Sequence, residues 1–461
     1  MGIVLVILIV LAVALRNAMQ RHRGPGGGGP RDGGAGLKRA GLIAGYVLLL
    51  LGLAAGLAIL STVPYFAPVW FLRLSGLVVA TAGLGGGAAL VYHLRRSLRG
   101  LPSAGLALPS PWWFVAAIPV VIAAGEYEIF VLMSGTSDLT ALIRFLLLII
   151  AGAALGPAAV LAYLAGTTGP ETTWRRATLC AAAGGTLSVL AVLTVGTVVP
   201  LTAAGLAVAL RNLGAGLIRD LTFSKSTQDV ARIFFSDRGV YAIATVAVAA
   251  PIAEEFLKPL GVIILGRRVR SPGEAFLLGA SCGAGFAILE NILYESAPPV
   301  FWGGIVFIRS IGAALHPMGA GLMALGWYGV FHGHPDAWRR LGVFYLIAIT
   351  QHWLWNMATV ATVLLVEPMA SGAFTVSILG VAVWTVLLLY FLGQGAAMFA
   401  AVRYVGRLVA RVPAGQPVPP LAPVRLASPR GIAIAATASL VAMMPLGAAG
   451  IQAFLMSLGR R

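Results

Sequence analysis

The sequence has 461 residues, of which 59% are hydrophobic and 10% are charged, and its mean hydropathy is +0.93. A soluble globular domain carries about 25% charged residues. The composition therefore excludes a soluble enzyme and predicts a multi-pass membrane protein. The only two cysteines, Cys180 and Cys282, lie in apolar runs, so neither a disulfide framework nor a zinc-thiolate site is indicated.

Apolar runs recur along the whole chain, and most approach the ~20 residues that cross a bilayer as a helix. In order they cover about residues 2–15, 41–62, 73–93, 112–133, 140–165, 177–198, 239–265, 274–294, 300–330, 342–366, 373–402 and 431–455. They predict an all-α fold, a polytopic transmembrane helix bundle of about 11 to 12 spans. The first run is short and no basic residue precedes it, so we interpret it as an anchor rather than a cleavable signal.

The net charge of +17 is distributed according to this topology. Of the 32 basic residues, 21 fall in one set of alternate loops and 9 in the other, and the larger set is expected in the cytoplasm. The remaining two, Lys258 and Arg309, fall inside spans. The basic excess therefore needs no nucleic acid partner.

The distribution of polar residues and linkers suggests three regions. They are an N-terminal transmembrane module over 1–238, with a Gly-rich cytoplasmic linker at about 16–40 and an extracytoplasmic segment at about 199–238; a four-span core over 239–366; and C-terminal spans with a Pro-rich cytoplasmic linker over 367–461.

The stretch "PIAEEFLKPL" places Glu254, Glu255 and Lys258 within a span. Each charge at a helix centre costs roughly 2.5 to 3.5 kcal/mol, so these residues need partners or a function. Glu254 and Lys258 are four residues apart and are expected to neutralise each other on one helix face, with Glu255 pointing about 100° away. Pro251 and Pro259 bracket the pair and predict breaks that expose backbone acceptors.

The next span, with "GFAILENILY", carries Phe286 and Glu290 on one face and Asn291 beside them. In the same span Gly279 and Gly283 have the GxxxG spacing that allows another helix to approach closely. A second intramembrane carboxylate thus follows the first pair.

Two further spans each carry a histidine with a polar partner. Arg309 and His316 are seven residues apart, which predicts one helix face, and His352 and Asn356 are four apart. A single such residue commonly serves only as a polar contact between helices. The whole set predicts carboxylates, imidazoles and an amide converging in one bundle interior.

Peptide hydrolysis needs a base for water, stabilisation of the oxyanion and a proton for the leaving amine. Glu255 or Glu254, together with Glu290, supplies carboxylates for the base and the acid. The side chains of His352 and Asn356 supply hydrogen-bond donors for the oxyanion.

The order EExxK, FxxxEN, a span with His316, then HxxxN resembles the PrsW family of bacterial intramembrane proteases, which is similar to the CAAX prenyl endopeptidases. Lys258 stands one position before the arginine of the CAAX pattern, and Glu290 stands where that pattern has histidine. Both differences favour PrsW. The resemblance covers roughly 239–366.

This resemblance implies a multi-pass protein of the bacterial plasma membrane that cleaves membrane-anchored proteins within the lipid bilayer, such as single-span anti-sigma factors. The matching residues are the candidate site. The catalytic candidates are Glu254, Glu255, Glu290, His316, His352 and Asn356, and the supporting candidates are Lys258, Phe286, Asn291 and Arg309.

Zinc is a possible cofactor of this site, because His316, His352 and Glu290 would form a His2Glu ligand set. The HExxH spacing of soluble zinc proteases is absent, and the extra carboxylates suit a metal-free glutamate mechanism, which we favour.

A proton- or cation-coupled transporter could also use such residues, but the first six spans hold no matching set. A catalytically silent membrane chaperone is the third interpretation.

Overall fold

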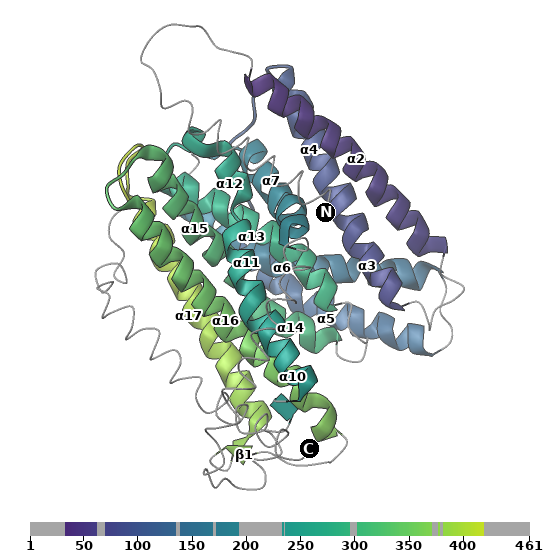
Figure 1. Cartoon of the computed structure of the whole chain (residues 1–461). Helices are drawn as coiled ribbons and strands as arrows, with labels where there is room; N and C mark the ends of the chain where they lie inside the picture. The colour runs from purple at the N-terminus through teal and green to yellow at the C-terminus, as the bar shows by residue number, and fades with distance from the viewer. Residues whose placement is uncertain are drawn as a thin grey trace, which may run out of the picture. The chain divides into compact units, whose positions relative to one another are not determined.

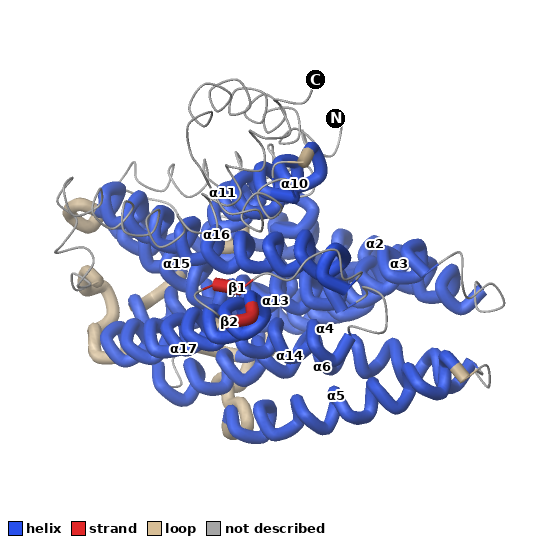
Figure 2. Tube along the Cα trace, turned by 90° about the horizontal axis from the view of Figure 1, so that it is seen from below, coloured by secondary structure: helices blue, strands red, loops and turns tan. Residues whose placement is uncertain are grey.

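The computed structural model describes residues 33–61, 70–134, 139–168, 172–192, 233–234, 236–295, 302–370, 377–378 and 381–418. Within them the chain is almost entirely helical, as Figures 1 and 2 show. A small antiparallel ladder pairs β1 (Ser377–Ile378) with β2 (Val381–Ala382). The predicted all-helical membrane fold is therefore confirmed for this part of the chain.

The helices follow one another along the chain without any larger sheet between them. In order they are α2 (Gly33–Ser61), α3 (Trp70–Thr81), α4 (Gly87–Leu98), α5 (Pro111–Met133), α6 (Leu139–Thr168), α7 (Trp174–Ala183), α10 (Asp237–Ala242), α11 (Ala250–Leu257), α12 (Leu260–Leu265), α13 (Pro272–Glu295), α14 (Trp302–Ile311), α15 (Leu315–His332), α16 (Ala337–Ala370) and α17 (Val383–Val409), within the described residues. Three π-helical segments, η2 (Ala82–Gly86), η3 (Gly184–Ser188) and η4 (Ile243–Ala249), and one 3₁₀ turn, η5 (Gly266–Arg268), continue or join them.

Eight helical stretches among the described residues are long and apolar enough to cross a membrane, so the chain is a multi-pass membrane protein. They are Ala35–Ile59, Gly76–Leu98, Pro111–Met133, Thr140–Thr168, Arg238–Arg268, Pro272–Glu295, Trp302–His332 and Thr385–Val409. The predicted count of 11 to 12 spans is not confirmed. The predicted runs 2–15 and 431–455 lie outside the described residues, as does most of the 199–238 segment.

One predicted span is present as a helix but is not among the eight. Helix α16 has 34 residues and includes the predicted run 342–366. Its hydropathy is lowered by Gln351, His352 and Asn356, which lie within two turns of one another. The residues that reduce its apolar character are thus the ones that suggest chemistry.

Two predicted boundaries differ from the structure. Residues 33–40, which we expected in the Gly-rich linker, belong to α2. This helix begins at Gly33, inside the small-residue stretch that precedes Lys38. The span predicted over 373–402 is α17, which begins at Val383 and continues to Val409. Long arginine side chains at its end can reach the polar interface, so the helix extends further than apolar content alone predicts.

The chain forms two compact units. Unit 1 comprises Met1–Ala191, Leu257–Phe344 and Met398–Pro419, and unit 2 comprises Val192–Phe256, Tyr345–Ala397 and Pro420–Arg461. The division of the chain at residues 238 and 366 stays a prediction.

Helix α13 is the centre of unit 1. In its apolar stretch 83% of residues are buried, compared with 17% in the stretch from α5. Small residues make this packing close: a Cβ atom at Gly279 would lie 2.5 Å from the carbonyl oxygen of Ala320 on α15, and one at Gly283 would lie 2.2 Å from that of His316. The predicted close-packing face is confirmed, and it fixes α15 against α13 at the level of His316.

Unit 2 has its own core, in which α16 packs beside η4 and α17. The buried apolar side chains of this core are Phe234, Ala247, Met357, Val360, Ala361, Leu364, Leu365 and Leu387. Those contributed by α16 lie immediately after Asn356. This packing holds the polar middle part of α16 beside η4, which leads into α11.

Candidate functional site

In unit 2, a buried histidine lies between two glutamates. Nδ1 of His352 on α16 lies 2.7 Å from Oε1 of Glu255 on α11, and Nε2 lies 3.8 Å from Oε2 of Glu254. An ionised carboxylate only accepts hydrogen bonds, so the short contact favours the proton on Nδ1. The Nε2 atom, on the side of Glu254, then carries the lone pair.

Asn356 lies one turn after His352 and anchors α16 to η4. Its Nδ2 donates a 2.8 Å hydrogen bond to the carbonyl of Val246. The amide of Ala250 donates to Thr245, five residues earlier, and in the same register Val246 would pair with Pro251, which has no N–H. The acceptor exposed by Pro251 is therefore one residue earlier than an α-helical register predicts, and Asn356 occupies it.

In unit 1, a second histidine contacts a glutamate that also pairs with an arginine. Nε2 of His316 on α15 lies 2.6 Å from Oε2 of Glu290 on α13. Nη2 of Arg309 on α14 donates to the same oxygen at 2.9 Å, and its Nε donates to Oδ1 of Asn291 at 2.5 Å. Asn291 in turn donates to the carbonyl of Ala153 on α6 at 3.0 Å. The Glu290 carboxylate is thus fixed from two sides.

Arg309 and His316 are not on one helix, and the prediction that they share one helical face is wrong. Helix α14 ends at Ile311, and α15 begins at Leu315 after a turn that contains Gly312. The turn nevertheless brings Nη2 of Arg309 within 3.3 Å of Nε2 of His316. The two residues meet across the helix break.

Lys258 also lies at a helix break. Helix α11 ends at Leu257, so Lys258 falls in the turn before α12. Its Nζ lies 4.7 Å from the centre of the Phe286 ring, a cation–π contact. That ring lies 5.6 Å from the ring of His316. The pairing of Lys258 with Glu254 stays a prediction.

The structure thus groups the candidate residues into two clusters. Unit 2 brings together Glu254, Glu255, His352 and Asn356, and unit 1 brings together Lys258, Phe286, Glu290, Asn291, Arg309 and His316. Each cluster contains one carboxylate–histidine pair. The predicted convergence of all these residues in one interior concerns both units and stays a prediction.

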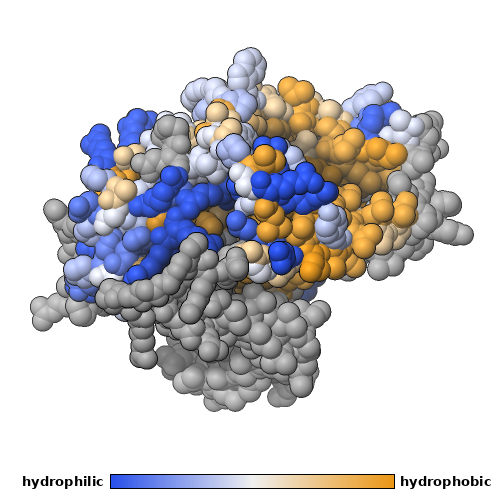
Figure 3. Space-filling model, turned by 90° about the horizontal axis from the view of Figure 1, so that it is seen from above, coloured by the Kyte–Doolittle hydropathy of each residue, from blue (hydrophilic) through white to orange (hydrophobic). Residues whose placement is uncertain are grey.

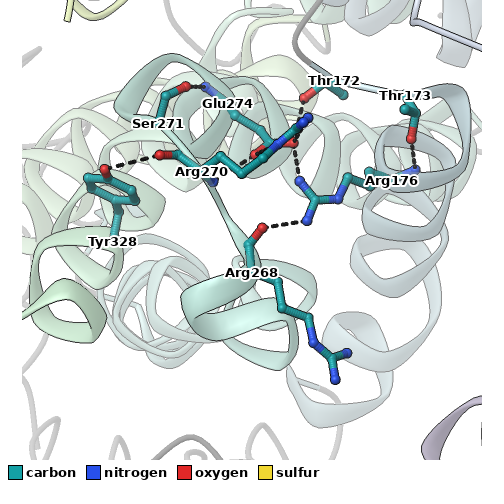
Figure 4. Close-up of polar contacts among 8 residues, drawn as sticks. All are labelled: Thr172, Thr173, Arg176, Arg268, Arg270, Ser271, Glu274 and Tyr328. Atoms are coloured by element: carbon teal, nitrogen blue, oxygen red, sulfur yellow. Dashed lines mark hydrogen bonds and ion pairs between the residues drawn. The ribbon is translucent and has the colours of Figure 1, made fainter. Parts of the chain in front are cut away.

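Two buried glutamates of α13 were missed by sequence analysis. Figure 4 shows Glu274 at the start of the helix, where its carboxylate accepts hydrogen bonds from Arg176, from the backbone amide of Arg270 at 2.8 Å and from Thr172 at 3.3 Å. The Glu274 amide donates to Oγ of Ser271 at 3.1 Å. The sequence "SPGE" is the signal that could have found it, since it has the capping-box pattern with proline at the first helical position.

The second missed residue is Glu295, at the other end of α13. It is 1% exposed, and its carboxylate oxygens have no hydrogen-bond partner among the described residues. Its position at the edge of a predicted span gave no signal, because acidic residues there are usually solvated. Helix α13 therefore carries buried carboxylates at both ends as well as Glu290.

A comparison with protein families matches residues 172–392 to the PrsW family of intramembrane metalloproteases. No curated protein and no solved structure matches this chain. The matched range contains both clusters and every motif on which the resemblance was based. The resemblance to the PrsW family drawn from the sequence motifs is therefore confirmed over residues 172–392.

Proposed function

We propose that the chain is an intramembrane endopeptidase that hydrolyses peptide bonds of membrane-anchored proteins, and that both carboxylate–histidine pairs take part in the reaction. The contact between Glu255 and His352 is the observation that carries this proposal. Burying a carboxylate and an imidazole between apolar helices is costly, and a short contact that sets the tautomer is typical of an oriented catalytic or metal-binding histidine.

The donor set of the site suits zinc, in agreement with the family's description as metalloproteases. Two ligands of a tetrahedral zinc, each ~2.0–2.1 Å from the ion, are roughly 3.4 Å apart. Nε2 of His352 and Oε2 of Glu254 are 3.8 Å apart, so a small shift would let both bind one ion. Glu255 on Nδ1 then completes the carboxylate–histidine–metal arrangement.

We assign the metal-holding role to His352 and Glu254 of unit 2. This assignment replaces Glu290 of the sequence-based zinc set, because Glu290 already contacts Arg309 and His316. It also replaces the metal-free mechanism we favoured from sequence. A bound zinc would lower the pKa of a water molecule and polarise the scissile carbonyl.

Side chains of the protein would then transfer protons, stabilise the oxyanion and orient the histidine. Glu290 takes a proton from water and gives it to the leaving amine, while its contact with Arg309 fixes its position. Asn356 uses one N–H on Val246 and offers the second to the oxyanion. Glu255 keeps His352 in the required tautomer.

The substrate class follows from the location of the site. Residues buried among membrane-crossing helices can reach only a peptide bond that enters the bilayer. A single-span protein in the bacterial plasma membrane, such as an anti-sigma factor, fits this requirement.

The test uses the purified full-length protein, a panel of single-span membrane peptides and a zinc measurement on the same sample. We expect cleavage that stops on chelation and returns with zinc. Cleavage in a metal-free sample would remove the metal role and leave the peptidase. Absence of cleavage across the panel, with proton flux in liposomes that requires Glu290, would contradict the proposal.

A further inference from the structure

Three arginines form a row at the end of helix α17. Arg403 and Arg407 are four residues apart on one helix face, and Arg411 follows four residues later, in the turn just after the helix. All three are exposed, as is the neighbouring Tyr404. They line a hollow of about 450 Å³ together with apolar side chains; its described lining is Ala400, Arg403, Tyr404, Arg407, Leu408 and Arg411.

This row lies where a membrane-crossing helix leaves the bilayer. The apolar stretch of α17 is Thr385–Val409, so Arg403 and Arg407 fall in its last two turns and Arg411 falls just beyond it. From Arg403 to Arg407 the helix rises about 6 Å, and Arg411 extends the row beyond its end. A length of this order extends across the polar headgroup layer at one side of a bilayer.

The row lacks a counter-charge among the described residues. At the same end of unit 1, Arg176 and Arg270 bind Glu274, and Arg340 donates to the carbonyl of Val418. Arg403, Arg407 and Arg411 have no side-chain hydrogen bond or ion pair with any residue in the described part of the chain. These arginines are therefore available to an anion that is not part of that protein surface.

The remaining sequence supplies little negative charge for them. After Glu367 the sequence has no aspartate or glutamate, so residues 368–461 offer no side-chain carboxylate. The acidic residues in the predicted cytoplasmic loops are Asp32, Glu171, Glu274 and Asp336, compared with 21 basic residues. Figure 3, which views this end of the molecule, shows hydrophilic side chains gathered beside hydrophobic ones.

We propose that this row is a binding site for the phosphate of an anionic phospholipid. One guanidinium group can donate two parallel hydrogen bonds to a phosphate. Basic pockets beside membrane helices bind anionic lipid headgroups. Ala400 and Leu408 offer apolar contacts, and Tyr404 is of the type that lies at the membrane interface. The mixed lining favours a lipid over a free phosphate ion, which would gain nothing from the apolar side chains. The positive-inside rule alone requires charge on this side but not a single row.

The test compares two triple variants of the full-length protein with equal loss of charge. The site variant is Arg403→Gln, Arg407→Gln and Arg411→Gln. The control variant is Arg95→Gln, Arg99→Gln and Arg268→Gln, three exposed arginines at the same end of unit 1. Native mass spectrometry of protein in detergent, titrated with phosphatidylglycerol or with phosphatidylcholine, reports the bound lipid.

We expect the unmodified protein and the control variant to bind phosphatidylglycerol more tightly than phosphatidylcholine. The site variant should bind phosphatidylglycerol roughly 100-fold more weakly, as expected for the loss of three interfacial charges at about 1 kcal/mol each. Equal weakening in both variants would show a diffuse charge effect and overturn the site. Displacement of the lipid by inorganic phosphate at equal concentration would likewise overturn the choice of a lipid.

Discussion

The two carboxylate–histidine pairs have the same short contact but different surroundings. The Glu255–His352 pair of unit 2, at 2.7 Å, has a second glutamate near its other nitrogen, and the Glu255 side chain is 1% exposed. The Glu290–His316 pair of unit 1, at 2.6 Å, has Arg309 on its carboxylate, and the Glu290 side chain is 12% exposed. The same kind of pair is therefore fully buried in unit 2 and partly accessible in unit 1.

This difference suggests different work for the two pairs. A sealed carboxylate that contacts Nδ1 can orient a histidine but cannot readily exchange protons with water. A partly accessible carboxylate held by a cation can receive a proton from water while keeping its position. We therefore expect the unit 1 pair to transfer protons and the unit 2 pair to bind and orient, and variants of each pair should separate these roles.

The largest effect is expected from Glu290→Gln, which removes the proposed base. The cleavage rate should fall by about 10³-fold, within the range for a lost general acid–base group. The matched control is Glu128→Gln, which breaks the Glu128–Arg144 ion pair of unit 1 outside the family match. Equal rate losses in both variants would show that Glu290 serves only to neutralise Arg309.

A smaller loss is expected from Asn356→Ala, because this side chain is proposed to contact the oxyanion only as it develops. The kcat should fall by about 10²-fold with little change in KM. Asn356→Asp is the companion variant, since it can no longer donate to Val246. An unchanged kcat in the alanine variant, with lower thermal stability, would assign Asn356 to anchoring η4.

Glu255→Gln should reduce activity by roughly 10- to 100-fold, the usual cost of removing an orienting partner of a metal-bound histidine. The zinc content after dialysis should fall in parallel, which a merely structural role would not produce. Glu290→Gln should keep its zinc by comparison. Zinc loss in the Glu290 variant alone would reverse the roles of the two pairs.

The smallest effect on catalysis is expected from Glu274→Gln, which lies outside both pairs. Its bonds to Arg176 and Arg270 fix the start of α13, so the variant should lose about 1.5–3 kcal/mol of stability. The thermal midpoint measures this loss, with Arg268→Gln as the control, because that side chain points away from the network in Figure 4. A variant as stable as the control would contradict the anchoring role.

The candidate site could be predicted because charged residues are conspicuous in apolar sequence. Glu254, Glu255 and Glu290 stand out against their spans, and their order indicated the family, which the comparison confirms. The close approach of α13 and α15 also followed from Gly279 and Gly283. The local sequence was sufficient for a prediction wherever one residue type carries one strong constraint, such as the free-energy cost of a charge inside the membrane.

The remaining features depend on where helices break and which parts pack together. The turn at Gly312 placed Arg309 and His316 on separate helices, and the end of α11 at Leu257 placed Lys258 in a turn. Neither helix break could be predicted from the spacing of apolar and polar residues, because that spacing does not change at the break. The division of the candidate residues between two units depends on packing between segments distant in sequence.

The most direct test is the cleavage rate of the double variant Glu255→Gln, Glu290→Gln beside both single variants. If both pairs act in the same reaction step, their losses are not independent, and the double variant should be no slower than about the slower single variant. Losses that multiply, or a single variant that cleaves at the unmodified rate, would contradict a joint role of the two pairs in that step.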